Sequence, residues 1–302
     1  MDFRPVIEPR GSGLIDAHLH CWDPARLPMA WLAEVPELER PCGISEYLSD
    51  LGGRADDLEA AVLVESAVDD SAVGRELDWL IEQVADAGPV RAAVAGWRPM
   101  AEFGELRKQL DAIAEAPGVV GVREVMHSSA WTAEDLRDPR LSRALRDAGG
   151  RGLLVELCVR PDQLISVADL LATAPETTVI LDHLGRPRTG AAADPAWMDA
   201  LGRVADAPNV LTKMSALIEC AQGDPWSASG FRPFIDAAIN RFGSDRVLWG
   251  GNWPRCRIGG SMASWLEACE EILRSVPGPD REAIFAGNAR RIYGLSTGPT
   301  SV

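Results

Sequence analysis

The chain has 302 residues, of which 46% are hydrophobic and 25% charged, and a formal net charge of −15. These values are typical of a globular protein, and the acidic balance argues against nucleic acid or an anionic membrane as a partner. No apolar run is long enough to span a membrane, and no basic and then apolar leader opens the chain. We therefore expect a cytoplasmic protein, monomer or homodimer, that acts on a small molecule.

The six cysteines stand at positions 21, 42, 158, 220, 256 and 269, without a Cys-x-x-Cys pair. In a chain of this length and expected location they predict free thiols rather than a disulfide framework.

The first predicted strand, residues 14–17, runs directly into His18 and His20. Residues two apart on a strand point to the same face, so both imidazoles are expected together at its end, with Asp16 on that face one layer lower. Two histidines at one strand end are typical of metal binding or proton transfer. The pattern therefore favours a functional site over one core histidine and one loop histidine.

Seven further apolar runs follow, separated by amphipathic helical patterns. The expected strands are 14–17, 61–65, 90–96, 119–123, 153–157, 178–182, 210–214 and 246–250. The expected helices include 73–87, 103–114, 139–148, 161–172, 195–205, 231–242, 262–276 and 280–293. Strands this apolar belong to a parallel sheet covered on both sides, and eight alternating units predict an α/β fold, a single-domain (β/α)8 TIM barrel.

Three parts are expected along the chain: an N-terminal extension over 1–13, the barrel over 14–295 and a C-terminal tail over 296–302. The stretch 23–57, between the first two strands, is rich in proline and too long for a simple connection. We expect it to form part of a lid.

Catalytic residues of such barrels gather at the carboxyl ends of the strands. The sequence places there His18, His20, Glu65, Arg123, Glu156, Asp182, His183, Arg186, Lys213, Asn252 and Trp253. The fourth histidine, His127, is expected in a loop or at the surface. Arg123 and Lys213 could hold an acidic substrate or pair with neighbouring carboxylates, and the two glutamates could orient the histidines or act directly.

Several of these motifs resemble those of the amidohydrolase superfamily. They are Ile-Asp-Ala-His-Leu-His-Cys-Trp-Asp-Pro at 15–24, Asp-His-Leu-Gly-Arg-Pro at 182–187, Lys-Met-Ser at 213–215, Gly-Gly-Asn-Trp-Pro at 250–254 and the closing segment 287–295. The similarity is greatest to the amidohydrolase-related branch with L-fucono- and L-rhamnonolactonases and 2-pyrone-4,6-dicarboxylate lactonase.

This resemblance implies a (β/α)8 barrel that hydrolyses a lactone or a related ester-like bond. It also implies that His18, His20 and His183 correspond to the metal-site histidines of the family, whose members differ in whether they hold an ion. We expect one divalent ion, zinc before others, or none.

The aspartate on the last strand of the family corresponds to Asn252 in this chain. An amide cannot take a proton from water near neutral pH, although it can orient a water molecule. Three interpretations follow: a natural variant with another base (Glu65, Glu156, Asp182 or His183), a deliberate Asp-to-Asn trap, or a binding protein without catalysis.

The sequence thus predicts a hydrolase in which water attacks the lactone carbonyl of a small sugar-acid or carboxylated substrate. The candidate catalytic residues are His18, His20, His183, Asn252 and Glu156. The candidate substrate-binding residues are Arg123, Lys213, Glu65, Arg186, Trp22 and Trp253, with Arg255, Trp31 and Trp226 as further contributors. The alternatives are metal-dependent decarboxylation of an aromatic acid on the same scaffold and the binding of a small acid without turnover.

Overall fold

The protein is described by a computed structural model over residues 13–128, 130–190, 192–221 and 223–295. The predicted tail and all but the last residue of the predicted N-terminal extension lie outside these ranges. The strands are β1 Leu14–Leu19, β2 Leu58–Val64, β3 Val90–Gly96, β4 Val119–Val125, β5 Leu154–Cys158, β6 Val179–Leu181, β7 Val210–Met214 and β8 Val247–Trp249. They form one parallel sheet in sequence order, and a bridge between Leu19 and Trp253 brings its two edges together. The predicted TIM barrel is confirmed.

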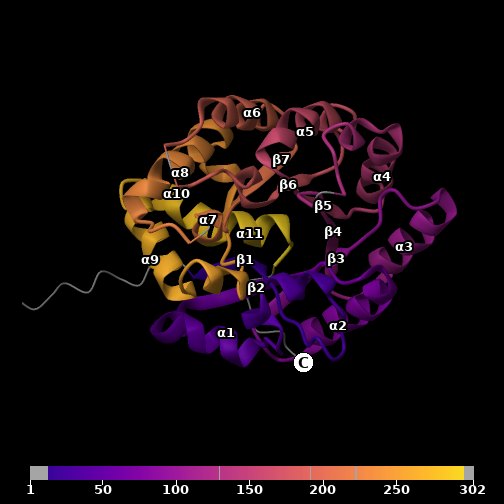
Figure 1. The fold of residues 1–302 in the computed structure, drawn as a ribbon, viewed down its shortest axis with the longest axis horizontal. Helices are drawn as coiled ribbons and strands as arrows, with labels where there is room; N and C mark the ends of the chain where they lie inside the picture. Colours follow the sequence, from indigo (N-terminus) through magenta and orange to yellow (C-terminus); the bar gives the residue numbers. More distant parts are fainter. Residues whose placement is uncertain (1–12, 129, 191, 222, 296–302) are drawn as a thin grey trace, which may run out of the picture.

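The helices surround the strands in a ring (Figure 1). They are α1 Ile44–Leu51, α2 Val73–Ala85, α3 Phe103–Glu115, α4 Pro139–Gly149, α5 Leu164–Leu171, α6 Pro195–Ala205, α7 Leu217–Cys220, α8 Ala228–Phe242, α9 Met262–Leu273, α10 Gly278–Glu282 and α11 Asn288–Ile292. Within the described residues, none of them is long and apolar enough to cross a membrane.

Two expected helices differ from the structure. The segment expected at 161–172 begins as a 3₁₀ turn, Pro161–Gln163, before α5. The segment expected at 280–293 is divided into α10 and α11 by a π-helical turn, Ala283–Gly287. Periodicity alone does not distinguish these tighter and wider turns from an α-helix.

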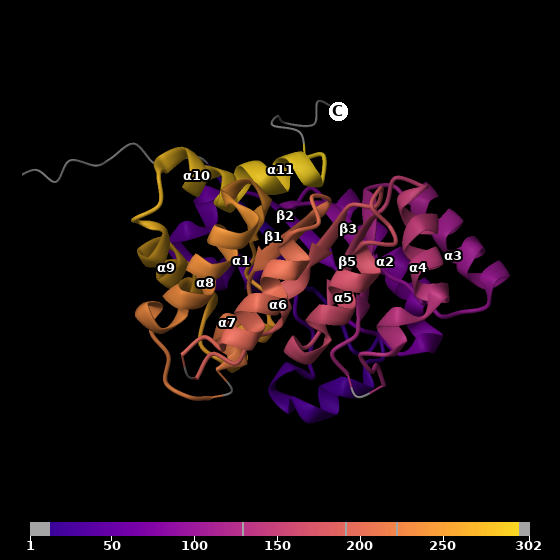
Figure 2. The ribbon, with the colours of Figure 1, turned by 90° about the horizontal axis from the view of Figure 1, so that it is seen from above.

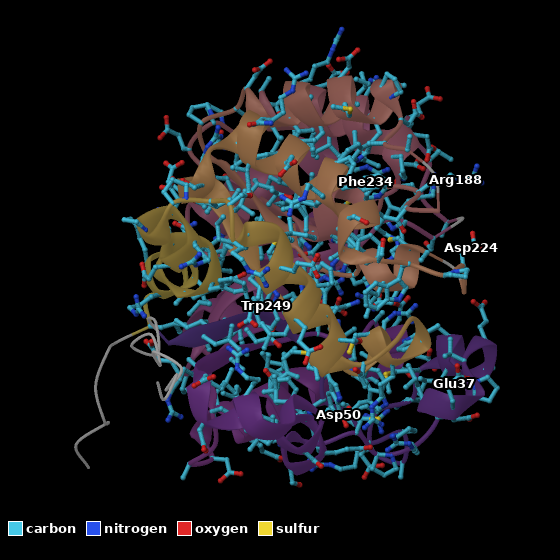
Figure 3. The ribbon with its side chains drawn as sticks, turned by 90° about the vertical axis from the view of Figure 1, so that its left-hand side faces the viewer. Glu37, Asp50, Arg188, Asp224, Phe234 and Trp249 are labelled. Carbon is cyan, nitrogen blue, oxygen red and sulfur yellow. The ribbon has the colours of Figure 1, made fainter. Side chains whose placement is uncertain are left out.

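The long connection after β1 contains the 3₁₀ helices Ala30–Glu34, Pro36–Leu38 and Gly52–Asp57 as well as α1. Connections that follow strands gather at one end of the barrel. Figure 3 shows this for Glu37, Arg188 and Asp224, which follow β1, β6 and β7 and lie along the same edge of the molecule. Helices α10 and α11 lie at the end opposite α7 (Figure 2). The strand carboxyl ends therefore open on the side away from the C-terminal helices.

The barrel interior is packed rather than hollow. Alternate strand residues fill it, among them Ile15, Val62, Ile180 and Leu248, and Tyr293 joins this cluster from the C-terminal segment. A larger cluster packs between the strands and the outer helices. Burial on both faces explains why the strands appear in the sequence as continuous apolar runs. Because the interior is packed, a ligand site can lie only at an end of the barrel.

Candidate active site

His18 and His20 meet at the end of β1, where their Nε2 atoms lie 3.2 Å apart. Nδ1 of His20 lies 3.0 Å from the carbonyl oxygen of Val64. Because a carbonyl only accepts, His20 carries its proton on Nδ1 and leaves a lone pair on Nε2. Nδ1 of His18 faces the ammonium of Lys213 at 3.1 Å. Since an ammonium only donates, His18 is protonated on Nε2 and donates to His20.

An irregularity in β1 aims these histidines. Between the pairs Asp16–Ala61 and Leu19–Leu63, β1 contains one residue more than β2. Such a bulge interrupts the alternation of faces and re-aims side chains. Asp16 therefore does not share the face of the histidines as expected. Its carboxylate instead accepts hydrogen bonds from the hydroxyl of Tyr47 on α1 at 3.0 Å and from the backbone N–H of Gly251 at 2.8 Å.

A buried network of charges lies beside the histidines. The ammonium of Lys213 contacts Glu156 at 2.5 Å and Asp182 at 3.4 Å. The guanidinium of Arg123 donates from Nε to Asp182 at 2.6 Å and from Nη1 to Glu65 at 2.5 Å. All five side chains are at most 5% exposed. Ionised groups this deeply buried require partners of opposite charge, and each of them has one.

A cavity of about 1090 Å³ opens at the strand ends. Of the predicted site residues, it is lined by His20, Trp22, Trp31, Glu65, Arg123, His183, Arg186, Asn252 and Arg255. Further lining residues include Arg98, Glu124, His127, Trp131 and Cys158. The volume is at the upper end of the range of small-molecule pockets.

Four predicted site residues lie outside this lining, as does the further contributor Trp226, whose Nε1–H donates to the carbonyl oxygen of Gly259 at 2.7 Å. His18, Glu156 and Lys213 are fully buried, and their side-chain polar contacts are with one another and with His20, Asp182 and Tyr293. Trp253 is also buried, and its Nε1–H donates to Asp50 at 2.8 Å, away from the cavity. The structure thus places these four as supports, whereas Arg186 and Arg255 reach the space that a ligand would fill.

Burial keeps the histidines neutral. It lowers the pKa of His20 and of His127 to about 3, and the positive charges of Arg123 and Arg186 respectively add to this effect. The pKa values of His18 and His183 also lie well below 6.5, again through burial first. A neutral imidazole is the form that can bind a metal ion or accept a proton.

Strained backbone marks the same strand ends. Residues with positive φ other than glycine are Ala67 after β2, His183, Leu184 and Arg186 after β6, Ala216 after β7 and Asn252 after β8. Such conformations cost of order 1–3 kcal/mol each and cluster at functional sites, where the surrounding structure enforces them. After four of the eight strands, residues at the barrel mouth therefore have a backbone conformation that the surrounding structure must hold in place.

Three residues were missed or undervalued by the sequence analysis. His127 lines the cavity instead of lying at the surface. Glu219, on α7, accepts a hydrogen bond from Asn252 at 2.6 Å. The hydroxyl of Tyr293 donates to Glu156 at 2.7 Å across the barrel interior. Only His127 had a sequence signal, its position just beyond a strand, because the other two partners are distant in the chain.

A divalent ion has a suitable set of ligands. His18, Asp182 and His183 each place one possible ligand atom within 4.8 Å of the others. Oδ1 of Asp182 is buried and accepts no hydrogen bond from the described residues. Two imidazole nitrogens and a carboxylate oxygen match the ligand preferences of zinc. In kind and spacing these residues fit such an ion, which would have to replace the ammonium of Lys213 at Nδ1 of His18. His20, expected as the third ligand, instead lies against His18.

Comparisons with known proteins agree with this architecture. The family model described as Amidohydrolase matches residues 15–295. An L-fucono-1,5-lactonase of Burkholderia ambifaria is 27% identical over 92% of this chain and 94% of its own length. A zinc-bound amidohydrolase structure from Burkholderia multivorans is 26% identical, with a TM-score of 0.81 over 94% of this chain and all of that one.

A more distant solved structure supports the fold alone. A putative 2-pyrone-4,6-dicarboxylic acid hydrolase from Pseudomonas putida is 22% identical, with a TM-score of 0.72 over 95% of this chain and 99% of that one. The family match, by contrast, extends over nearly the whole chain. The resemblance noted in the sequence is confirmed: this protein is an enzyme that belongs to the amidohydrolase family.

Proposed function

We propose that this protein is a lactonase, which adds water to the carbonyl of a small lactone at the barrel mouth. The observation that carries the proposal is the cavity itself, where neutral His20 and His183, the guanidinium of Arg123 and the amide of Asn252 line one space. Similarity to L-fucono-1,5-lactonase over nearly the full length supports the reaction class.

His183 is the residue that we assign to proton transfer. Its Nδ1 is hydrogen-bonded to Oγ of Ser215 at 2.7 Å, which leaves Nε2 for the cavity. As water attacks the carbonyl carbon, Nε2 takes one water proton, and it returns this proton to the ring oxygen when the carbon–oxygen bond of the lactone breaks. The product is the hydroxy acid, and the histidine is neutral again.

Arg123 stabilises the developing oxyanion in this scheme. Its Nε and Nη1 hold Asp182 and Glu65, so Nη2 remains to donate to a ligand in the cavity. A donor fixed before the reaction stabilises charge without reorganisation. A zinc ion held by His18, Asp182 and His183 would occupy Nε2 of His183. In that case the ion would supply Lewis-acid polarisation of the carbonyl, and His183 would be its ligand instead of the base.

The substrate that we propose carries an anionic group such as a carboxylate. Arg186 and Arg255 line the cavity, and both stabilise the carboxylate of Glu219 by their charge without an ion-pair contact among the described residues. The guanidinium of Arg255 lies 5.1 Å from the ring centre of Trp31, which also lines the cavity. Arginines without a protein partner are suited to a carboxylate ligand, and the indole to its apolar part.

The proposal is tested with a panel of neutral and carboxylated lactones, with acid release as the readout. We expect turnover of at least one carboxylated lactone and its loss in His183→Ala. Unchanged activity in that variant would refute the assigned site. A thermal shift with the panel but no turnover would instead favour a binding protein.

Metal content is measured separately, after chelation and addition of zinc back to the protein. The scheme with His183 as the base requires that Nε2 of this residue binds no zinc. One zinc per chain, lost in His183→Ala with its fold checked by circular dichroism, would make His183 a ligand instead. Equal zinc binding by the folded variant would place the ion elsewhere.

A further inference from the structure

A buried amide and a buried carboxylate form a pair between the ends of β7 and β8. Nδ2 of Asn252 donates to Oε2 of Glu219 at 2.6 Å. Asn252 is 1% exposed and Glu219 is 8% exposed. A hydrogen bond to an ionised group is stronger than one between neutral groups, and burial strengthens it further. The pair therefore fixes both side chains.

This bond decides which atom of the amide faces the cavity. A carboxylate only accepts, so Asn252 must turn its NH₂ group toward Glu219. Asn252 lines the cavity and Glu219 does not. The carbonyl oxygen Oδ1 is therefore the atom of Asn252 that is turned away from Glu219.

Oδ1 of Asn252 is buried and has no hydrogen-bond partner among the described residues. A buried acceptor without a partner costs about 1–3 kcal/mol. A water molecule or a hydroxyl group that donates to Oδ1 would remove this cost. Oδ1 of Asn252 is thus an acceptor that a hydrogen-bond donor of a ligand or water molecule could satisfy.

The backbone of Asn252 is fixed as well. Its φ is +53°, in the left-handed region that asparagine tolerates better than most residues other than glycine. Its N–H donates to the carbonyl oxygen of His18 at 2.7 Å. The acceptor is therefore held directly beside the histidine that anchors the site.

The pKa of Glu219 is raised above its ordinary value, because burial outweighs the groups that stabilise its carboxylate. Burial raises the pKa of Glu219, and the charge of Arg255, the hydrogen bond from Asn252 and the charge of Arg186 oppose this rise. All three opposing groups stabilise the carboxylate, which is the form that orients the amide.

We propose that Glu219 is a positioning residue, which holds Asn252 so that Oδ1 accepts a hydrogen bond from the attacking water. This inference rests on the proposed lactonase reaction. The amide orients the water and takes no proton, since that proton passes to His183.

The test exchanges the two groups. In Glu219→Gln each of the two amides can donate or accept, so Asn252 loses its single orientation. We expect kcat to fall about 10–100-fold, with KM changed less than about 3-fold. In the double variant Asn252→Asp/Glu219→Gln only the glutamine can donate, so an aspartate oxygen faces the cavity. We expect kcat of the double variant to return at least to that of the parent.

Full activity in Glu219→Gln would overturn the proposal, as would a double variant no more active than Glu219→Gln. If Glu219→Gln fails to fold, the double variant alone decides, because it keeps one amide and one carboxylate at the pair. Glu267→Gln, at an exposed carboxylate on α9, is the matched control and should match the parent.

A second readout does not depend on turnover. The side-chain NH₂ resonance of Asn252 is identified in amide NMR spectra by its loss in Asn252→Asp. We expect a downfield proton in the parent, as in hydrogen bonds to carboxylates, that moves upfield in Glu219→Gln. An unmoved resonance would refute the pair, whereas a moved resonance without lactone hydrolysis would refute only the proposed function.

Discussion

The ammonium nitrogen of Lys213 lies 3.1 Å from Nδ1 of His18, on the side of the imidazole away from His20. Lys213 is fully buried and also contacts Glu156 at 2.5 Å. The lysine therefore fixes the tautomer of His18 and compensates a buried carboxylate. It acts on the chemistry through the histidine rather than through contact with a ligand in the cavity.

Loss of this lysine should destabilise the protein. Lys213→Met leaves Glu156 buried without its cation, which typically costs 3–5 kcal/mol. We expect the free energy of unfolding in urea to fall by about this amount. In Lys213→Met/Glu156→Gln a neutral amide replaces the carboxylate, and its oxygen can still accept the hydrogen bond from Tyr293. Most of the lost stability should therefore be recovered.

The matched control is Lys108→Met, because Lys108 is exposed and pairs only with Glu105 on its own helix. Such surface pairs contribute about 0–1 kcal/mol. A Lys213→Met variant no less stable than this control would contradict the view that the lysine balances buried charge.

Arg255 should determine selectivity for anionic substrates. A hydrogen bond to a charged group contributes about 1.5–3 kcal/mol, which corresponds to roughly 10–100-fold in affinity. We expect Arg255→Met to raise KM for a carboxylated lactone by about this factor and to change KM for its neutral analogue little. The measurement is the ratio of kcat/KM for the two substrates.

Arg257→Met is the control for this experiment. Arg257 lies two residues away and is held by Glu46 and Asp50 at 2.7 and 2.6 Å. It should leave the ratio unchanged. An equal decrease in kcat/KM for both substrates in Arg255→Met would show that the arginine supports the fold and does not recognise a charge.

The fold could be predicted because the barrel strands are buried on both faces. Each strand then appears as a short apolar run, and β3 and β7 were predicted with their observed bounds, Val90–Gly96 and Val210–Met214. The strand ends also carry the polar residues that line the mouth. Local periodicity is therefore sufficient for the architecture and for the approximate place of the site.

The arrangement within the site could not be predicted, because it depends on contacts between distant segments. The bulge in β1 turns Asp16 toward Tyr47, and no pattern within the strand shows it. For Lys213 the sequence left open whether it holds an acidic substrate or pairs with a neighbouring carboxylate, and its contact with buried Glu156 shows the pairing. Strand-end position alone does not decide whether a side chain supports the floor of the site or reaches the ligand.

His127 gives the protein a measurable sensitivity to acid. Its pKa in the folded protein is lowered to about 3, chiefly by burial and then by the charges of Arg186, Arg123 and Arg255, against 6.5 for a free side chain. Below pH 6.5 the unfolded chain therefore gains a proton at His127 that the folded protein does not bind. The free energy of unfolding therefore decreases as the pH falls from about 6.5 toward 3.

For a group that only the unfolded chain protonates, each pH unit below 6.5 lowers the free energy of unfolding by about 1.4 kcal/mol. Between about pH 7.5 and 5.5 the parent should therefore lose roughly 1 kcal/mol more of its free energy of unfolding than His127→Gln. Urea unfolding at both pH values measures the difference, and comparison across pH cancels any constant effect of the substitution. The same loss in parent and variant would show that the fold does not protect the imidazole of His127 from protonation.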